Sequence, residues 1–565
     1  MNAIGCRPSS GSIRAIPNRR SGNCQNWATA VVAILVALPL SVVHAYQFSS
    51  GDWGGSLDTT ISYGVNYRAE GQDKKLIAAA NGGTGTNAKR INSDDGDLNF
   101  KKGELFSEVA KVVSELGLKW QDQYGLFLRG RAFYDFELMD DNRRHRQITA
   151  GGLDEAGSNV ELLDAFVYGS WMFGERSLNA RVGRQVINWG EGLYYRNGIN
   201  ASNPLDLNAL RAPGSEVKES LMPTFKIYTS YQLSESLTFE SYYQPAWAND
   251  KTKLDPCGSY FSTTDVFDEG CDYLAVGAFD NPSVPGASPF LFVPRAPDIK
   301  ADSAAQFGVA LRWFAPELND TEFGLYYLRF SDQLPRLGAT VSRRLGGQPV
   351  PSTGTYYAEY LENRELYGLS FNTTIGGENI FSGQSLFGEV SYQPDAPISL
   401  TTGTILAAAL LDPAGPPFGT RVENYRKKDM YQASLGTIRT GRGVLGSNST
   451  TYIAELVANR VMGIETDLAY GDVTSSAYGA TASASMTYND VFRGINVIPS
   501  LSHARAFNGV APTLTNGLSE RAWSTSVAVD ASYLDALSFG VRYVDYTGGA
   551  TGDRDYLSFN VKYSF

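Results

Sequence analysis

The sequence predicts an all-β fold, a transmembrane antiparallel β-barrel of about 16 strands. Three observations favour it: the composition, long stretches in which apolar and small polar residues alternate, and an aromatic strand at the C-terminus. Aromatic residues make up 12% of the 565 residues, 58 residues are glycine, and only 19% are charged. Aromatic residues are enriched in strands, whereas a helical protein would be rich in Ala, Leu, Glu and Lys. The composition therefore indicates many strands joined by turns.

The clearest alternating stretch runs from Arg521 to Tyr533. Trp523 and Tyr533 bracket an aliphatic centre on one face, and the opposite face is small and polar. About ten residues at about 3.3 Å each, tilted by about 40°, span about 25 Å, the height of the apolar band of an outer-membrane barrel. The pattern recurs in several other stretches: 126–137, 306–313, 367–372 and 537–543.

Closure of the sheet follows from the lipid environment. Lipid offers no hydrogen bonds, so every backbone group must pair within the protein, and only a closed sheet lacks unpaired edges. The pattern marks roughly fourteen to eighteen strands, and bacterial barrels usually have an even number, which gives the expectation of about 16. The remaining residues must then form long ordered loops.

Residues 1–45 are predicted to be a cleaved signal peptide. Four arginines precede an apolar stretch from Trp27 to Leu40, and Val43-His44-Ala45 fits a cleavage site. The mature chain, 46–565, is expected to be a single barrel domain. Cleavage removes four arginines and no acid, so the net charge changes from −11 to −15. Such an acidic protein is a poor binder of nucleic acid, because phosphate affinity depends on Lys and Arg.

The C-terminal strand predicts the location. Tyr556 to Phe565 places five large apolar residues on one face and ends in phenylalanine, which resembles the assembly signal of Gram-negative outer-membrane barrels. We therefore expect the outer membrane of a Gram-negative bacterium, contact with its lipids, and recognition by the barrel assembly machinery through the strand ending at Phe565. The alternative, an edge strand of a soluble protein, would leave a large apolar face to be covered.

Four segments carry a family resemblance: "GRQVINWGEGLYYRNGINASNPLD" (183–206), "PGSEVKESLMP" (213–223), "CGSYFSTTDVF" (257–267) and "GEVSYQPDAPI" (388–398). Together they resemble the outer-membrane family known as domain of unknown function 1302, through nearly the whole mature chain. The resemblance implies a barrel, in bacteria whose related proteins are often linked to transport of envelope lipid or hydrophobic compounds. Periplasmic or inner-membrane transport proteins are the further partners expected on this basis.

The irregular stretch after Gln185 is the main candidate site. Its glycines permit sharp turns, and it combines aromatic with charged residues. We interpret it as a loop that enters the lumen and lines a ligand path; the alternative is a structural loop that braces the barrel wall. The candidate residues lie at the end of the preceding strand, in this loop, in the turn that follows it and on one charged strand face: Arg184; Asn188, Trp189, Glu191, Asn203 and Asp206; Glu216, Lys218 and Glu219; Arg129, Arg131 and Asp135.

Two further residue groups have defined chemistry. Cys257 and Cys271 are the pair left after cleavage of the signal, and in an oxidising compartment they can form a disulfide. Asp94, Asp95 and Asp97 surround Gly96 and offer oxygen ligands for calcium, but their spacing is not that of an EF-hand loop. We therefore expect the disulfide and assign no metal or cofactor.

No enzyme motif is complete. His503 lies near Ser500 and Ser502, but a serine hydrolase also needs an orienting third group and an oxyanion site, which the local sequence does not supply. The leading hypothesis is a non-enzymatic barrel that passes or transfers a small, hydrophobic or lipidic molecule across the outer membrane. The alternatives are a hydrophilic solute porin, an outer-membrane lipid hydrolase, and a plugged structural or surface-binding barrel.

Overall fold

The computed structural model describes residues 46–85, 91–247, 251–264, 266–277, 279–282, 285–301, 306–377, 382–464, 468–512 and 517–565. The predicted signal peptide, 1–45, lies outside the described residues and stays a prediction. Within the described ranges, no helix is both long and apolar enough to span a membrane.

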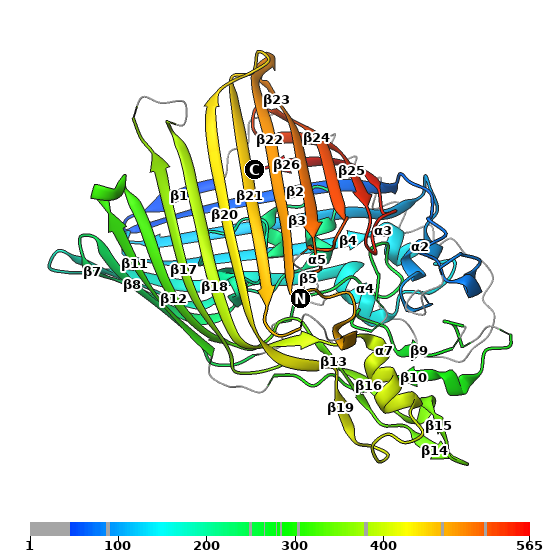
Figure 1. Cartoon of the computed structure of the whole chain (residues 1–565). Helices are drawn as coiled ribbons and strands as arrows, with labels where there is room; N and C mark the ends of the chain where they lie inside the picture. Colours follow the sequence, from blue (N-terminus) through cyan, green and yellow to red (C-terminus); the bar gives the residue numbers. More distant parts are fainter. Residues whose placement is uncertain are drawn as a thin grey trace. The chain divides into compact units, whose positions relative to one another are not determined.

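Eighteen antiparallel strands close into a barrel (Figure 1), which confirms the predicted class with two strands more than the approximate number. They are β2 (Trp53–Arg68), β3 (Leu105–Trp120), β4 (Tyr124–Asp135), β5 (Ser158–Phe173), β6 (Arg176–Gln185), β7 (Thr224–Ser234), β8 (Leu237–Gln244), β11 (Gln306–Ala315), β12 (Thr321–Phe330), β17 (Arg364–Ile375), β18 (Gln384–Ser399), β20 (Tyr425–Arg442), β21 (Ser449–Val461), β22 (Ser476–Phe492), β23 (Ile495–Asn508), β24 (Trp523–Tyr533), β25 (Leu537–Thr547) and β26 (Tyr556–Ser564). Apolar and polar residues alternate least clearly in β8 and β12. Their inner faces also carry buried apolar side chains, so the alternation is weak.

The seam of the barrel joins its first and last long strands. Thr60 to Arg68 of β2 pairs with Ser564 to Tyr556 of β26. The backbone of Phe565 then exchanges hydrogen bonds of 2.7 and 2.9 Å with Thr59. β1 (Tyr46–Ser50) forms a hairpin with the start of β2 and continues the seam beyond the C-terminus. The C-terminal strand thus completes the closure, because no wall strand is left with an unpaired edge.

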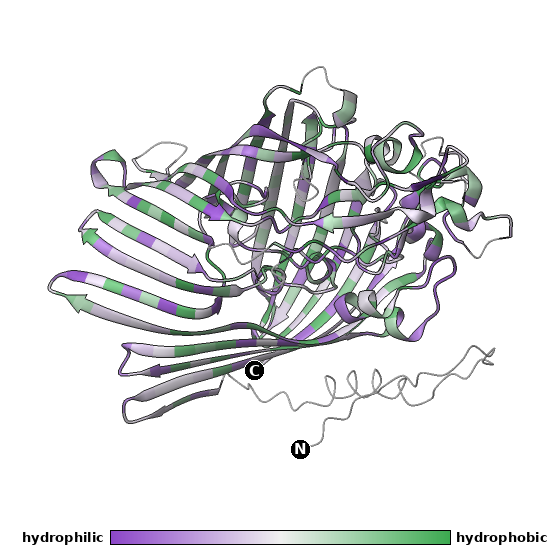
Figure 2. Cartoon of the chain, turned by 90° about the horizontal axis from the view of Figure 1, so that it is seen from below, coloured by the Kyte–Doolittle hydropathy of each residue, from purple (hydrophilic) through white to green (hydrophobic). Residues whose placement is uncertain are grey.

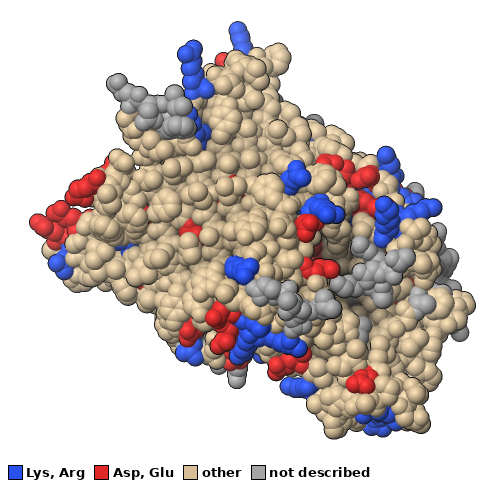
Figure 3. All heavy atoms as spheres, in the orientation of Figure 1, with Lys and Arg blue, Asp and Glu red and all other residues tan. Residues whose placement is uncertain are grey.

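The outer surface of the barrel is a lipid-facing surface. Hydrophobic and hydrophilic residues alternate along the strands (Figure 2), and charged side chains gather at the two ends of the wall (Figure 3). Exposed aliphatic side chains occupy the outer face at mid-height, for example Leu162, Leu369, Leu456 and Val529. A row of stacked, tilted or edge-to-face aromatic rings lies near each rim: Phe307, Tyr327, Tyr367, Tyr392 and Tyr431 at one, and Trp53, Trp120, Tyr124 and Trp171 at the other. Closure, apolar band and aromatic girdles identify a barrel of the Gram-negative outer membrane.

The two ends of the barrel differ in their connections. One end has short turns, such as 121–123 and 534–536, and both termini of the barrel lie there. The other end has the long connections, of which 69–104, 186–223, 245–305 and 331–363 are the longest. In outer-membrane barrels the short turns face the periplasm and the long loops face the exterior.

The long connections form their own small structures. They contain β9 (Tyr273–Ala275) with β10 (Phe292–Pro294), β14 (Arg343–Leu345) with β15 (Gln348–Val350), and the sheet of β13 (Arg336–Thr340), β16 (Thr355–Glu359) and β19 (Arg421–Glu423). The helices and helical turns of these connections are α2 (Asp95–Asn99), α3 (Phe136–Asp140), α4 (Ala150–Ala156), α5 (Leu207–Arg211), α6 (Val217–Ser220), α7 (Thr402–Ile405), η7 (Leu406–Leu411), η1 (Ala79–Asn81), η3 (Ile199–Ser202), η4 (Pro289–Leu291), η6 (Pro351–Thr353) and η8 (Leu468–Tyr470). A further helical turn, η5 (Pro316–Leu318), lies in the short connection between β11 and β12. A separate apolar core, which includes Leu274, Val293, Leu337 and Tyr356, holds these loops together.

Cys257 and Cys271 form a disulfide bond in the 245–305 connection, with their Cα atoms 5.3 Å apart. Both residues are buried beneath the loops. The bond closes a loop of 14 positions, and cross-linking a loop of this length stabilises a structure by about 3 kcal/mol.

We expect the double variant Cys257→Ser, Cys271→Ser to loosen the long loops and to leave the barrel intact, because the disulfide lies outside the strand ladder. Limited proteolysis should cut within 245–305 faster than in the unmodified protein. The shift in gel mobility between unheated and heated samples, which reports the folded barrel, should not change. Equal rates of cleavage in the two proteins would show that the disulfide does not hold the loops.

Candidate functional site: a segment that crosses the lumen

The connection between β6 and β7, residues 186–223, enters the barrel, and we name it the crossing segment. Its first half contacts the inner faces of β8, β17, β18, β20, β21 and β22, and its second half those of β2, β3, β4 and β26. In the closed ring, β22 lies opposite β6 and β7. The segment therefore reaches the far wall and returns.

Glu389 of β18 is the first anchor of the crossing segment. Its carboxylate accepts hydrogen bonds from the backbone N–H groups of Glu191 at 2.7 Å, Gly192 at 3.1 Å and Ile199 at 3.2 Å. Successive backbone N–H groups that converge in this way form a concave anion site. Gly190 makes the close approach possible, because its φ is 85° and a Cβ there would lie 2.4 Å from the carboxylate.

Glu455 of β21 is the second anchor. It accepts hydrogen bonds from the N–H groups of Leu193 at 3.1 Å and Tyr194 at 2.7 Å. The Tyr195 hydroxyl is hydrogen-bonded to Thr481 of β22, at 3.1 Å. Both anchors face the lumen, since the next residue on each strand is an exposed apolar residue of the outer face. Neither glutamate is among the candidate residues predicted from the sequence. The available signal was a lone acid at an inward position of an otherwise uncharged alternating stretch.

Trp189 fixes the start of the crossing segment against the wall. Its indole N–H donates to Glu240 of β8 at 2.7 Å, and its ring packs against Tyr242 and Tyr326 at centroid distances of 5.1 and 5.8 Å. Only 2% of Trp189 is exposed. This packing explains the apolar inner faces of β8 and β12, because the wall here is covered by protein and not by water.

Asn203 ties the two ends of the first half together. Its side-chain amide donates to the carbonyl of Ile187 at 2.7 Å, and its oxygen accepts from the Ile187 N–H at 3.3 Å and from Lys226 of β7 at 3.0 Å. The chain therefore leaves the wall at Ile187 and returns to the same place sixteen residues later. Asn203 has a bracing role in this geometry.

Asp206 begins the second half with a buried ion-pair network. Its carboxylate lies 2.7 Å from Arg131 of β4, which also pairs with Glu161 of β5 at 2.8 Å. Lys253, from the 245–305 connection, lies 3.5 Å from Asp206. Because Asp206 also accepts the N–H of Ala209 and caps α5, one carboxylate links wall, crossing segment and outer loops.

The turn at α6 is held by charge pairs with β3 and β26, the two strands that flank β2. Glu216 and Glu219 form the capping box of α6. Glu219 pairs with Lys111 of β3 at 2.6 Å, and Glu216 with Lys562 of β26 at 3.2 Å. Lys218 reaches Glu115 of β3 at 2.8 Å. Arg129 bridges the same Glu115, at 3.1 Å, and Asp164, at 2.7 Å.

The electrostatics of the crossing segment follow from these partners. Burial raises the pKa of Glu191 above its usual value, although a hydrogen bond from Asn372 of β17 opposes the rise. For Glu216, burial acts in the same direction, but Lys562 and Lys218 outweigh it and lower the pKa. Glu216 therefore remains charged under acidic conditions in which Glu191 accepts a proton more readily.

Three further candidate residues differ in their surroundings. Arg184 is on the outer face of β6 and is exposed, since it follows Val182 in the lipid-facing register. Asn188 is exposed at the start of the crossing segment. Asp135 is buried at the end of β4, where it caps α3 by accepting the N–H of Leu138 at 3.0 Å. The prediction that Arg184 lines the lumen is wrong, because the alternation of side chains along β6 places it on the outer face.

The carboxylates of Asp94, Asp95 and Asp97 each bind different partners. Asp97 pairs with Arg68 and Arg554, and Asp95 with Arg146, while Asp94 accepts the N–H of Ala78. The three carboxylates therefore do not form a shared calcium shell. In the described part of the chain, the group that could hold a cation consists of Asp95, His145 and Asp280, whose ligand atoms lie within 4.8 Å of one another.

The serine and histidine of the hydrolase alternative point apart. His503 is on the outer face of β23, where its Nδ1 lies 3.0 Å from the Thr525 hydroxyl. Ser500 and Ser502 alternate with it along the strand and therefore face the lumen. The geometry of a Ser–His pair is absent at these positions.

Two cavities lie between the crossing segment and the wall formed by β22–β26. Within the described part of the chain, no hydrogen bond or ion pair of the crossing segment leads to β23, β24 or β25. A cavity of about 430 Å³ lies toward the long-loop end, and its lining includes Tyr194, Tyr195, Ser502, Ala504, Leu518 and Ser524. A cavity of about 280 Å³ lies nearer the short-turn end, and its lining includes Gly214, Asp530, Arg542, Asn560 and Lys562.

We expect Arg131→Met to release the second half of the crossing segment, because it leaves the buried Asp206 without its closest cation. Removing one partner of a buried pair costs about 3–5 kcal/mol. Hydrogen exchange of the amides in 204–223 should accelerate accordingly, with the strand amides unchanged. The double variant Arg131→Met, Asp206→Asn should recover part of the protection. If exchange in the single variant matches the unmodified protein, the ion pair does not hold the segment.

The chain is distantly similar to several solved structures. The outer membrane channel DcaP of Acinetobacter baumannii is 9% identical, over 93% of this chain and 100% of that chain, with a TM-score of 0.37. OccAB1 of Acinetobacter baumannii is 10% identical over 92% and 98%, and opdK of Pseudomonas aeruginosa 8% over 90% and 98%, each with a TM-score of 0.41. A search of curated proteins finds no match. The family described as protein of unknown function (DUF1302) matches residues 26–565, nearly the whole chain, and the protein belongs to this family.

Proposed function

We propose that the barrel is a channel that passes a small hydrophobic or amphiphilic molecule across the outer membrane, along the wall formed by β22–β26. The observation that carries this proposal is how the crossing segment is attached: among the described residues, no hydrogen bond or ion pair joins it to β23, β24 or β25. It is tied to β22 and β26 at the two edges of this wall, and the two cavities lie between it and the strands β23, β24 and β25. Barrels of sixteen to eighteen strands are wide enough to leave an aqueous lumen, so the crossing segment sets the width of the route.

The lining of the two cavities indicates the class of solute. Aromatic and small apolar side chains dominate the outer cavity, which has a volume within the range of about 300–1,000 Å³ typical of small-molecule sites. The inner cavity is polar and carries Asp530, Arg542 and Lys562. Tyr546 lines the outer cavity and Tyr556 lines the inner one, and the two rings stack with their centroids 6.4 Å apart. A molecule with both apolar and polar parts fits an apolar outer cavity that is followed by a polar inner cavity.

Small side chains on the wall provide the space. On β23 and β24 the inward positions beside the outer cavity are Ser502, Ala504 and Ser524. A larger residue would have to enter the cavity, because the crossing segment is fixed on its other side by Glu455. The width of the route therefore depends on small residues on one side and anchored backbone on the other.

A hydrophilic solute porin is the second candidate, and the polar lining of the inner cavity favours it. The two functions differ in selectivity. A porin should admit sugars and ions at comparable rates, whereas the proposed channel should prefer amphiphilic solutes. Liposome swelling with a sugar and with a small amphiphile of equal mass separates them, and equal rates would favour the porin.

We expect Ser502→Trp to lower the single-channel conductance in a planar bilayer severalfold, because the indole would fill the outer cavity. Leu501→Trp is the matched control: it places the same side chain on the same strand but toward lipid, where Leu501 is already 50% exposed. Its conductance should equal that of the unmodified protein. Equal conductance of both variants and the unmodified barrel would rule out this route.

We also expect the double variant Glu389→Ala, Glu455→Ala to raise the conductance and make it noisier, since five backbone N–H groups of the crossing segment lose their acceptors. Glu317→Ala, an exposed acid in a short turn, controls for the loss of charge. A conductance no higher than that of the control would mean that the segment is not the constriction.

A further inference from the structure

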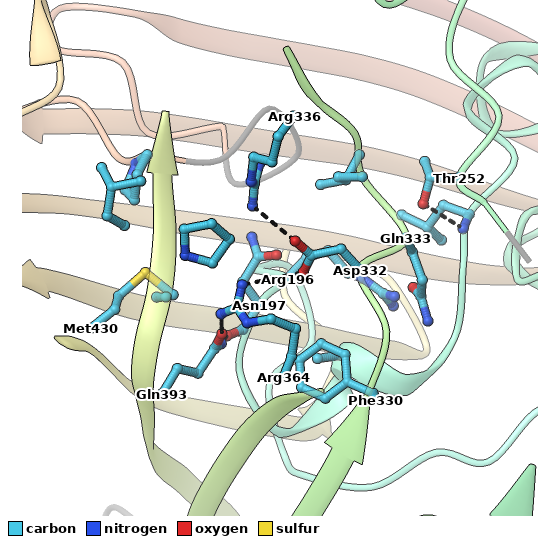
Figure 4. A pocket seen from close by; sticks show the side chains of 17 residues that line it. Arg196, Asn197, Thr252, Phe330, Asp332, Gln333, Arg336, Arg364, Gln393 and Met430 are labelled. Carbon is cyan, nitrogen blue, oxygen red and sulfur yellow. Dashed lines mark hydrogen bonds and ion pairs between the residues drawn. The ribbon is translucent and has the colours of Figure 1, made fainter. Parts of the chain in front are cut away.

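A third cavity, of about 60 Å³, lies at the long-loop end on a different wall of the barrel (Figure 4). It is enclosed by the crossing segment near Arg196, by the ends of β12, β17, β18 and β20, and by two long connections. Three arginines line it: Arg196, Arg336 and Arg364. Asp332 is the carboxylate among the lining residues, so the cavity carries an excess of positive charge.

The carboxylate of Asp332 is shared loosely between two of the arginines. Its distance is 3.4 Å to the Arg364 guanidinium and 3.8 Å to that of Arg336. Both distances exceed the roughly 2.7–2.9 Å of a strong charge-assisted hydrogen bond. Asp395, exposed at the bulge of β18, adds a weaker attraction to Arg364. Arg364 also donates to the side-chain oxygen of Gln393 at 3.1 Å, which is a neutral acceptor. The two guanidinium groups therefore share one carboxylate among the residues that line the cavity.

Arg196 of the crossing segment has no acidic partner among the described residues. Its guanidinium donates to the backbone carbonyl of Asn203 at 2.5 Å, which is a neutral acceptor. Burial alone lowers the pKa of Arg196 to about 10, and the group stays protonated at neutral pH. Arg196 is partly buried, and a cation that is shielded from water without a counter-charge is unfavourable for folding.

An unused donor also faces the cavity. The Nε of Arg336 is buried and has no hydrogen-bond partner among the described residues. The planar guanidinium fork matches carboxylate and phosphate geometry. At about 10–15 Å³ for each water, the cavity has room for about four waters or for one group of carboxylate size. Phe330, Leu334 and Met430 supply an apolar side of the same cavity.

We propose that this cavity is a binding site for an oxyanion group, the carboxylate or phosphate of a small solute, held between Arg196 of the crossing segment, Arg336 of the 331–363 connection and Arg364 of β17. The bound anion supplies the missing negative charge and links the crossing segment to the rim. The site lies on a different wall from β22–β26, so its existence does not depend on the proposed route.

The test is a titration of the purified, folded barrel in detergent micelles with acetate, benzoate and inorganic phosphate, at constant ionic strength made up with chloride. Isothermal titration calorimetry should show saturable binding of at least one anion with one site per chain. Acetate and benzoate against phosphate distinguish the two sources of the oxyanion, and benzoate against acetate measures the apolar side. Arg336→Gln and Arg364→Gln should each weaken binding by about tenfold, the effect of a lost charge-assisted hydrogen bond.

Arg493→Gln is the matched control, because it makes the same charge change in the exposed β22–β23 turn at the opposite end of the barrel. It should bind the anion as the unmodified protein does. Arg196→Gln separates a binding role from a structural one. Without anion its unfolding temperature should be equal to or higher than that of the unmodified barrel, and the anion should no longer raise it.

Three results would overturn the proposal. One is the absence of saturable binding for all three anions. Another is affinity in Arg336→Gln and Arg364→Gln equal to that of Arg493→Gln. The last is an Arg196→Gln variant that unfolds at a lower temperature and is still stabilised by the anion. Binding that is lost in the arginine variants while Ser502→Trp leaves conductance unchanged would support this site and contradict the proposed route.

Discussion

The lack of hydrogen-bonding partners in lipid is the constraint on which the rest of the structure depends. It requires a closed sheet, and closure is completed where β26 pairs with β2 and Phe565 with Thr59. With eighteen strands the closed wall surrounds more space than its own inward side chains fill. The lumen must therefore be either open or filled by another part of the chain. Here the crossing segment enters it, and the position of the cavities follows from where that segment is attached.

The attachment uses two different kinds of chemistry on the two sides. On the side of β18 and β21, carboxylates of the wall accept backbone N–H groups, so the position of the first half depends on its backbone conformation more than on its side chains. On the side of β3, β4 and β26, side-chain ion pairs hold the second half. The backbone contacts require glycine at Gly190, which explains why this stretch looks irregular in the sequence. Bracing the wall and narrowing the lumen are thus two consequences of the same contacts.

The two cavity systems divide the lumen by charge. Where the crossing segment meets β22–β26, small wall residues leave space without a strong excess of charge in the outer cavity. Where it meets β12, β17 and β18, three arginines surround one aspartate. Arg196 and the Tyr194–Tyr195 pair are neighbours in the chain, so the positively charged cavity and the outer cavity share one short stretch of backbone. A ligand at the arginines would therefore act on residues that line the other cavity.

The sequence by itself determined the barrel class, the lipid-facing residues and the terminal strand, because a period of two and an aromatic rim are local properties of each strand. It also identified the loop after β6, since glycines with mixed aromatic and charged residues are visible without a fold. Only the tertiary structure decided which partners this loop meets. Glu389 and Glu455 lie about 200 residues or more beyond it in the chain, and Arg336 of β13 and Arg364 of β17 also lie far beyond Arg196 in the chain. Local patterns carry no information about such pairs, and the outward turn of Arg184 likewise depends on the register of β6 with its neighbours.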